Sequence, residues 1–73
     1  MDNVTAIREQ YADMLADFYD RVASDLREMA RKWAESEQYH EAERTYIKSR
    51  VFVEVAFELR RPKAIRLEQE AGQ

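Results

Sequence analysis

The sequence predicts an all-α fold, built as a long helical hairpin. Three observations lead to this prediction. One Gly and one Pro among 73 residues leave few helix breakers. Apolar residues recur at helical spacing in both halves of the chain. Hydrophobic residues make up 45% of the chain, which is too many for a disordered protein. A chain of this length can form only one small domain, so we expect residues 1–73 to be a single helical domain.

The first helix is predicted over about residues 3–35. Its apolar residues form triplets that repeat every eleven residues, which is about 3.67 residues per turn and keeps them on one face. These residues are Val4, Ile7, Tyr11, Leu15, Phe18, Val22, Leu26, Met29 and Trp33. Asp2 or Asn3 can cap the helix, because either side chain can accept a hydrogen bond from a free N–H of the first turn.

The second helix is predicted over about residues 37–61, after a tight turn. No Gly or Pro marks this turn, so one bent or continuous helix is the alternative. Ser36 is the expected N-cap of the second helix, and Glu37 and Glu41 suit the positive end of its dipole. Its apolar residues form a surface wider than one partner helix can cover. An alternative remains, because residues 50–59 are rich in β-branched side chains and alternate with period two. They would then form a strand that pairs across a dimer.

Pro62 is expected to end or kink the second helix, because it lacks an N–H and disfavours helix for the residue before it. A short C-terminal helix is predicted over about residues 63–71, with Gly72 as its stop. Residues 62–73 can equally be a mobile tail.

The residues around the turn resemble the helix-turn-helix of a tetratricopeptide repeat, in which small and aromatic residues pack one helix on the next. The matching positions are Leu26, Ala30, Trp33, Tyr39, Ala42, Tyr46 and Ser49. Glu37 lies near the place of that family's turn glycine, and the chain holds no second copy of the repeat. The resemblance implies hairpin packing and no peptide-binding groove.

The residue types needed for catalysis are scarce. The chain has no Cys, one His and no glycine-rich phosphate loop, so we expect neither enzymatic activity nor a cofactor. Glu37 and His40 have the Glu-x-x-His spacing of di-iron bundles, but a surface His beside capping acids explains them better, and we assign no metal. No apolar run approaches a membrane span and no signal peptide is recognised, so we expect a cytoplasmic protein with no membrane contact.

The wide apolar surface predicts self-association, because it would promote aggregation if left exposed. We expect two hairpins to form a homodimeric four-helix bundle around a two-fold axis. The predicted dimer or core interface consists of Leu15, Phe18, Val22, Leu26, Met29, Trp33, Tyr46, Val53 and Phe57.

Two charged groups are the candidate surfaces for a partner. The acidic stripe consists of Glu9, Asp13, Asp17 and Asp20, and the basic cluster consists of Arg60, Arg61, Lys63 and Arg66. Either group can also be a solvated face, and the basic cluster can pair with the acidic stripe of a neighbouring subunit.

The sequence therefore predicts a small protein-interaction module that binds another protein, as an adaptor, an assembly factor or an inhibitor. Inhibitors encoded by mobile elements or phages are often this compact, which is an analogy. The alternative is a DNA-associated transcriptional regulator that contacts phosphates through the basic cluster. A net charge of −3 argues against nucleic acid as the main partner.

Overall fold

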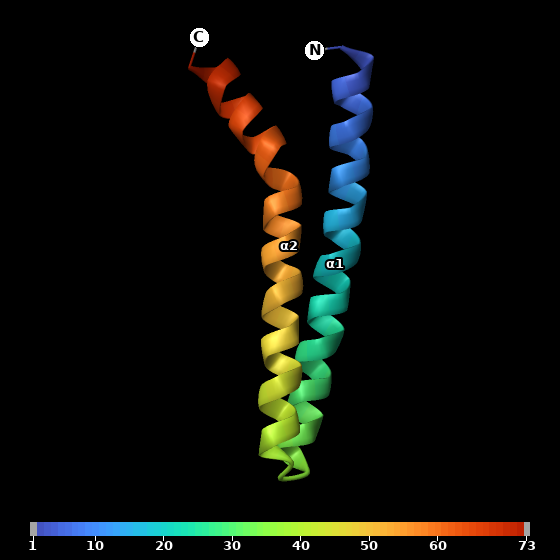
Figure 1. The fold of residues 1–73 in the computed structure, drawn as a ribbon, viewed down its shortest axis with the longest axis vertical. Helices are drawn as coiled ribbons and strands as arrows, with labels where there is room; N and C mark the ends of the chain where they lie inside the picture. Colours follow the sequence, from blue (N-terminus) through green and yellow to red (C-terminus); the bar gives the residue numbers. More distant parts are fainter. Residues whose placement is uncertain (1, 73) are drawn as a thin grey trace.

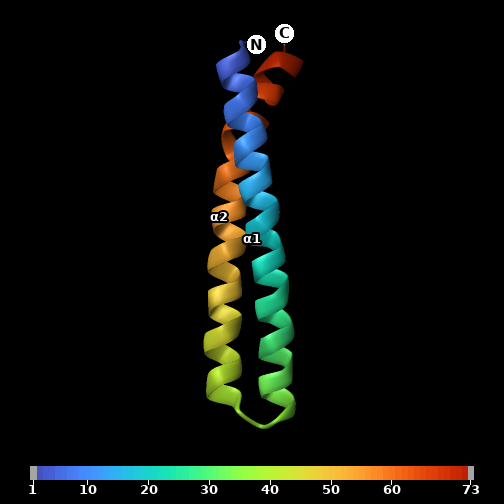
Figure 2. The same cartoon turned by 90° about the vertical axis from the view of Figure 1, so that its right-hand side faces the viewer.

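The computed structural model describes residues 2–72, which form two antiparallel helices. Helix α1 spans Asn3–Glu35 and helix α2 spans Tyr39–Ala71. The two termini lie at one end of the hairpin and the turn lies at the other (Figures 1 and 2). The molecule is long and flat, with extents of 53 × 22 × 12 Å. The prediction of an all-α helical hairpin is confirmed.

Helix α1 begins and ends with satisfied backbone groups. The Asp2 side chain accepts a hydrogen bond from the Thr5 N–H at 2.7 Å, as an N-cap does. At the other end, the Glu37 N–H donates to the Ala34 carbonyl at 3.0 Å and the Gln38 N–H donates to the Trp33 carbonyl at 2.9 Å. This pair of bonds is the Schellman motif, which closes a helix C-terminus.

The turn contains a residue in a left-handed conformation. Glu37 has φ of 62°, the only positive value among the described residues. A Schellman motif places its left-handed residue here, and glycine normally fills that position. The predicted N-cap role of Ser36 is wrong, because Ser36 is the C-cap of α1. Helix α2 instead begins after Gln38, which makes no side-chain capping bond.

Helix α2 continues through Pro62 to Ala71, so the prediction of a separate third helix over 63–71 is wrong. A proline fits the φ of an α-helix and removes only one backbone hydrogen bond, so a helix can continue through it with a kink. The C-terminal part of α2 bends away from α1 (Figure 1), and Pro62 lies inside this helix. Gly72 caps the helix, as predicted.

The strand alternative for residues 50–59 is also wrong, because all of them lie within α2. The same part of the chain also carries small residues at helical spacing. Of these, Thr45, Ser49 and Ala56 are buried in the hairpin. Packing of this face overrides the β-propensity of the valines, as tertiary context often does.

The buried core of the hairpin is made only of small residues. Ala16, Ala23 and Ala30 are buried on α1, seven residues apart, and they oppose the buried residues of α2. The Ser49 hydroxyl donates to the Tyr46 carbonyl at 2.5 Å, so this buried polar group is satisfied. Side chains this small let two helices approach closely but bury little apolar area.

The seam between the helices follows a heptad pattern with alternating steps of three and four residues. Its buried and half-buried members are Thr5, Glu9, Ala12, Ala16, Tyr19, Ala23, Leu26 and Ala30 on α1, and Ala42, Thr45, Ser49, Phe52, Ala56, Leu59, Lys63 and Arg66 on α2. This seam differs from the eleven-residue stripe of large apolar residues on α1. The stripe is therefore not the centre of the intramolecular core.

Candidate interaction surface

The large apolar side chains of the described residues lie outside the core. Sixteen of them are between 38% and 67% exposed, and the buried hydrophobic residues are all alanines. Leu15, Val22 and Leu26 of the predicted interface are half-buried. Its other members are exposed and comprise Phe18, Met29, Trp33, Tyr46, Val53 and Phe57. Large apolar patches on the surface of a soluble protein usually mark interaction sites.

The flat hairpin has two broad faces, and an aromatic contact between the helices shows which residues lie on one of them. Tyr19 stacks on Phe52 with ring centroids 5.6 Å apart. Residues three, four and seven apart share a helix side, so Leu15, Val22 and Leu26 lie on the side of Tyr19. By the same spacing, Val55 and Leu59 lie on the side of Phe52. Both helices therefore contribute large apolar residues to this face.

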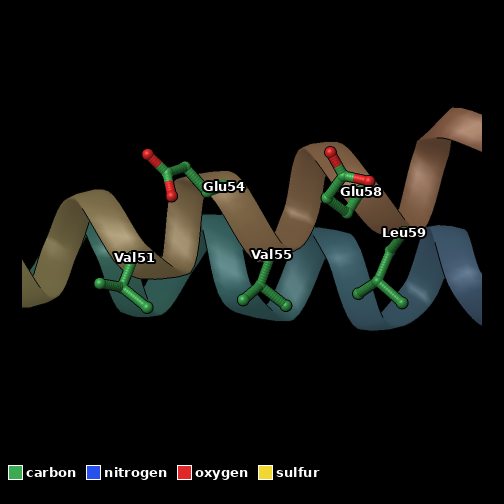
Figure 3. Close-up of a pocket in the computed structure, with 5 residues that line it drawn as sticks. All are labelled: Val51, Glu54, Val55, Glu58 and Leu59. Atoms are coloured by element: carbon green, nitrogen blue, oxygen red, sulfur yellow. The ribbon is translucent and has the colours of Figure 1, made fainter.

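We refer to this surface as the apolar face. It consists of Leu15, Phe18, Val22, Leu26, Met29 and Trp33 of α1 and Val51, Val55 and Leu59 of α2. Figure 3 shows Val51, Val55 and Leu59 in one row, with the carboxylates of Glu54 and Glu58 on the other edge of the helix. These five residues line an open hollow of about 410 Å³. A second hollow of about 290 Å³ lies beside Met29 and Trp33 near the turn.

An ion pair identifies the opposite broad face. One Arg60 nitrogen lies 2.7 Å from an Asp17 oxygen and 2.8 Å from an Asp20 oxygen. Asp20 follows Tyr19 directly, so it leaves α1 on the other side of the seam. Val53 and Phe57, seven and three residues before Arg60, share its side of α2. Tyr46, Val53 and Phe57 therefore lie apart from the apolar face, next to the acidic edge of α1.

The acidic stripe and the basic cluster meet across the hairpin. Arg66 donates two hydrogen bonds to the Glu9 carboxylate, at 2.5 and 2.7 Å, and Lys63 lies 2.7 Å from Asp13. With the pairs of Arg60, these contacts join the part of α2 around Pro62 to the first half of α1. The predicted acidic and basic residues thus neutralise one another within one chain. Arg61 is the exception, since it faces Glu58 of its own helix at 3.5 Å.

These ion pairs shift the pKa values of Glu9, Arg66 and Arg60. Hydrogen bonds from Arg66 hold the pKa of Glu9 below the usual value of a glutamate, with help from the nearby positive charges. Hydrogen bonds to Glu9 and Glu70 raise the pKa of Arg66. Hydrogen bonds to Asp20 and Asp17 likewise raise the pKa of Arg60. Glu9 is also the least exposed of the paired acids, with a side chain that is 12% exposed.

This pairing could have been found in the sequence, although we predicted only a pairing between subunits. Acids at positions 9, 13 and 17 and bases at positions 66, 63 and 60 run in opposite directions from a turn near residue 37. An antiparallel hairpin brings such positions to the same height.

The remaining sequence candidates do not converge on a site. Glu37 lies in the turn and His40 lies in the first turn of α2, so the two do not share a helix face. Within residues 2–72, no group of three or more His, Asp or Glu side chains is placed to hold a metal ion. Neither described helix is both long and apolar enough to cross a membrane.

Comparison with known proteins finds no matching family model, no matching curated protein and no matching solved structure.

Proposed function

We propose that this protein is a non-enzymatic protein-interaction module that works by binding other protein surfaces. The observation that carries the proposal is the inverted placement of its apolar residues. Among the described residues only alanine, serine and threonine are buried, while sixteen large apolar residues are 38–67% exposed. A hairpin with such a small core buries too little apolar area to be stable alone at this length. The exposed residues therefore need a partner.

The first partner that we propose is a second copy of the chain, packed apolar face to apolar face as a four-helix bundle. With extents of 53 × 22 Å, the broad side of the hairpin is large enough for a standard stable interface, which buries roughly 800 Å² per partner. The face carries large apolar residues from both helices, so a two-fold axis can bring identical patches together. Tyr46, Val53 and Phe57, which we predicted within this interface, lie on the other face.

The charges favour protein binding over the DNA-binding alternative. Three of the four residues of the basic cluster, Arg60, Lys63 and Arg66, are already paired with acids of α1. Phosphate contacts would have to displace these acids, in a chain whose net charge is −3. An adaptor, an assembly factor or an inhibitor remains the class that suits this surface.

A matched pair of α2 variants tests the proposal. Val55 belongs to the apolar face, whereas Ile47 lies two residues from both Thr45 and Ser49 and so points away from α1. Both side chains are exposed in the hairpin, at 38% and 53%, so neither variant should disrupt the seam. We expect Val55→Asp to weaken dimerisation about 100-fold or more, because the dimer would bury an unpaired charge.

Sedimentation velocity over a concentration series measures this effect, and circular dichroism verifies that the variants remain helical. Ile47→Asp should keep the wild-type mass. Equal masses for Val55→Asp and the wild type would refute the bundle.

A further inference from the structure

The bundle leaves a second, different surface on the outer face of α2. It is a strip of residues at helical steps of four, three, four and four: Tyr46, Arg50, Val53, Phe57 and Arg61. We infer that this docking strip binds an acidic amphipathic helix of a partner protein. The inference rests on the proposed function, because it assumes that the apolar face is covered by a second copy.

The shape of the docking strip suits a single helix. Its members follow one line along α2, because each step is close to one helical turn. From Tyr46 to Arg61 the line covers about 22 Å, at 1.5 Å per residue. Its apolar members Tyr46, Val53 and Phe57 are 50%, 40% and 66% exposed. Beside Phe57, an open hollow of about 400 Å³ is lined by Arg60, Arg61, Ala64, Ile65 and Glu68.

The chemistry of the docking strip points to an acidic partner. Arg50 forms no ion pair with any of residues 2–72. Arg61 is 59% exposed, and its single pair with Glu58 is long, at 3.5 Å. The neighbouring acids on α1, Asp17 and Asp20, are already paired with Arg60. A helix that carries carboxylates would therefore meet the unpaired Arg50 and an Arg61 whose ion pair lies within its own helix.

The residue types agree with this assignment. Tyrosine and arginine are enriched at the centres of protein interfaces, where they supply most of the binding energy. Arginine binds carboxylates with two parallel hydrogen bonds. An amphipathic helix would place its apolar residues against Tyr46, Val53 and Phe57 and its acids against Arg50 and Arg61.

Two designed peptides test the inference. Both are 18-residue amphipathic helices with the same apolar residues and a fluorescein label, and their flanking positions are all Glu in one and all Lys in the other. Fluorescence anisotropy is measured with the full chain. We expect the Glu peptide to bind at least tenfold more tightly than the Lys peptide, and its binding to weaken as salt is added. Equal affinities, or no binding of the Glu peptide, would overturn the inference.

A charge reversal locates the binding. Arg50→Glu should reduce the affinity for the Glu peptide at least tenfold. The control is Arg44→Glu, because Arg44 does not belong to the docking strip, although its side chain is 59% exposed like that of Arg61. An equal loss in both variants would contradict the assignment.

Sedimentation of the same samples separates this inference from the proposed function. If Arg50→Glu abolishes dimerisation, the docking strip belongs to the self-association interface and the inference fails while self-association stands. If the wild-type chain is monomeric, the proposed four-helix bundle is refuted, independently of the peptide affinities.

Discussion

Glu37 is the residue on which the hairpin turn depends, because it occupies the left-handed position of the Schellman motif with φ of 62°. A side chain with a Cβ is strained there, whereas glycine is not. We expect Glu37→Gly to stabilise the protein by about 0.5–1 kcal/mol, after subtraction of the greater entropy of glycine in the unfolded chain.

Thermal unfolding at a fixed protein concentration measures this gain. Glu43→Gly is the control, because residue 43 lies inside α2 and a glycine there should destabilise by about 1 kcal/mol. A lower Tm for Glu37→Gly than for the wild type would show that the turn does not need a left-handed residue.

Glu9 is the acid whose titration the fold changes through an inter-helix contact. Its pKa is lowered in the folded protein, first by the hydrogen bonds from Arg66. A lowered pKa stabilises the fold above the pKa of the unfolded chain, and this contribution is lost as the pH falls through the folded value. Glu9→Gln should therefore lower the Tm at pH 7, and the difference from the wild type should vanish between roughly pH 5 and pH 2.

Unfolding curves for both proteins across that range test the prediction. Asp2 and Glu28 also have lowered pKa values, but they titrate in both proteins and cancel in the comparison. A difference in Tm that is the same at pH 7 and pH 2 would mean that the ion pair with Arg66 does not contribute.

At the scale of the elements, the small-residue seam sets how closely α1 and α2 approach. Ala23 is fully buried in it. We expect Ala23→Leu to cost about 1–3 kcal/mol, because the extra methyl groups have no space between the helices. The exposed neighbour Ser24 provides the control, since Ser24→Leu should change stability by no more than about 0.5 kcal/mol. An unchanged Tm for Ala23→Leu would show that the seam is loosely packed.

The elements also show how far the sequence could predict this fold. The two helices, the bounds of α1 and the approximate start of α2 were predictable because caps, helical periodicity and the lack of breakers are local signals. The continuation of α2 through Pro62 was not, because it involves tertiary contacts. Arg60, Lys63 and Arg66 hold the residues around Pro62 to α1, and a rule about local backbone sterics does not include them.

The same local signals did not show which face of each helix packs against the other helix. Helix α1 carries two patterns, an eleven-residue stripe of large residues and a heptad of small ones. Hydrophobicity alone ranks the stripe, which includes Phe18 and Trp33, above the alanines. The alanines nevertheless form the intramolecular seam, because small side chains allow close approach of the second helix. The sequence therefore predicted a large apolar surface but did not show that Tyr46, Val53 and Phe57 lie on a different broad face from Phe18 and Trp33.

At the scale of the whole molecule, the hairpin is a flat plate with two unlike broad faces. One face is apolar from both helices, and the other combines the docking strip of α2 with the acidic edge of α1. The acidic stripe is paired with Arg60, Lys63 and Arg66 away from the apolar face, whereas Glu54 and Glu58 border the apolar face along α2. Self-association through this face is the central claim, because both the stability of so small a core and the availability of the docking strip depend on it.

The most direct test of that claim is the mass of the wild-type chain in solution. Sedimentation equilibrium over a range of micromolar concentrations gives this mass without reference to shape, which matters for a molecule 53 Å long and 12 Å thick. We predict twice the chain mass of 8.7 kDa, with dissociation only on dilution. A stable, helical species of 8.7 kDa at every concentration would contradict the account.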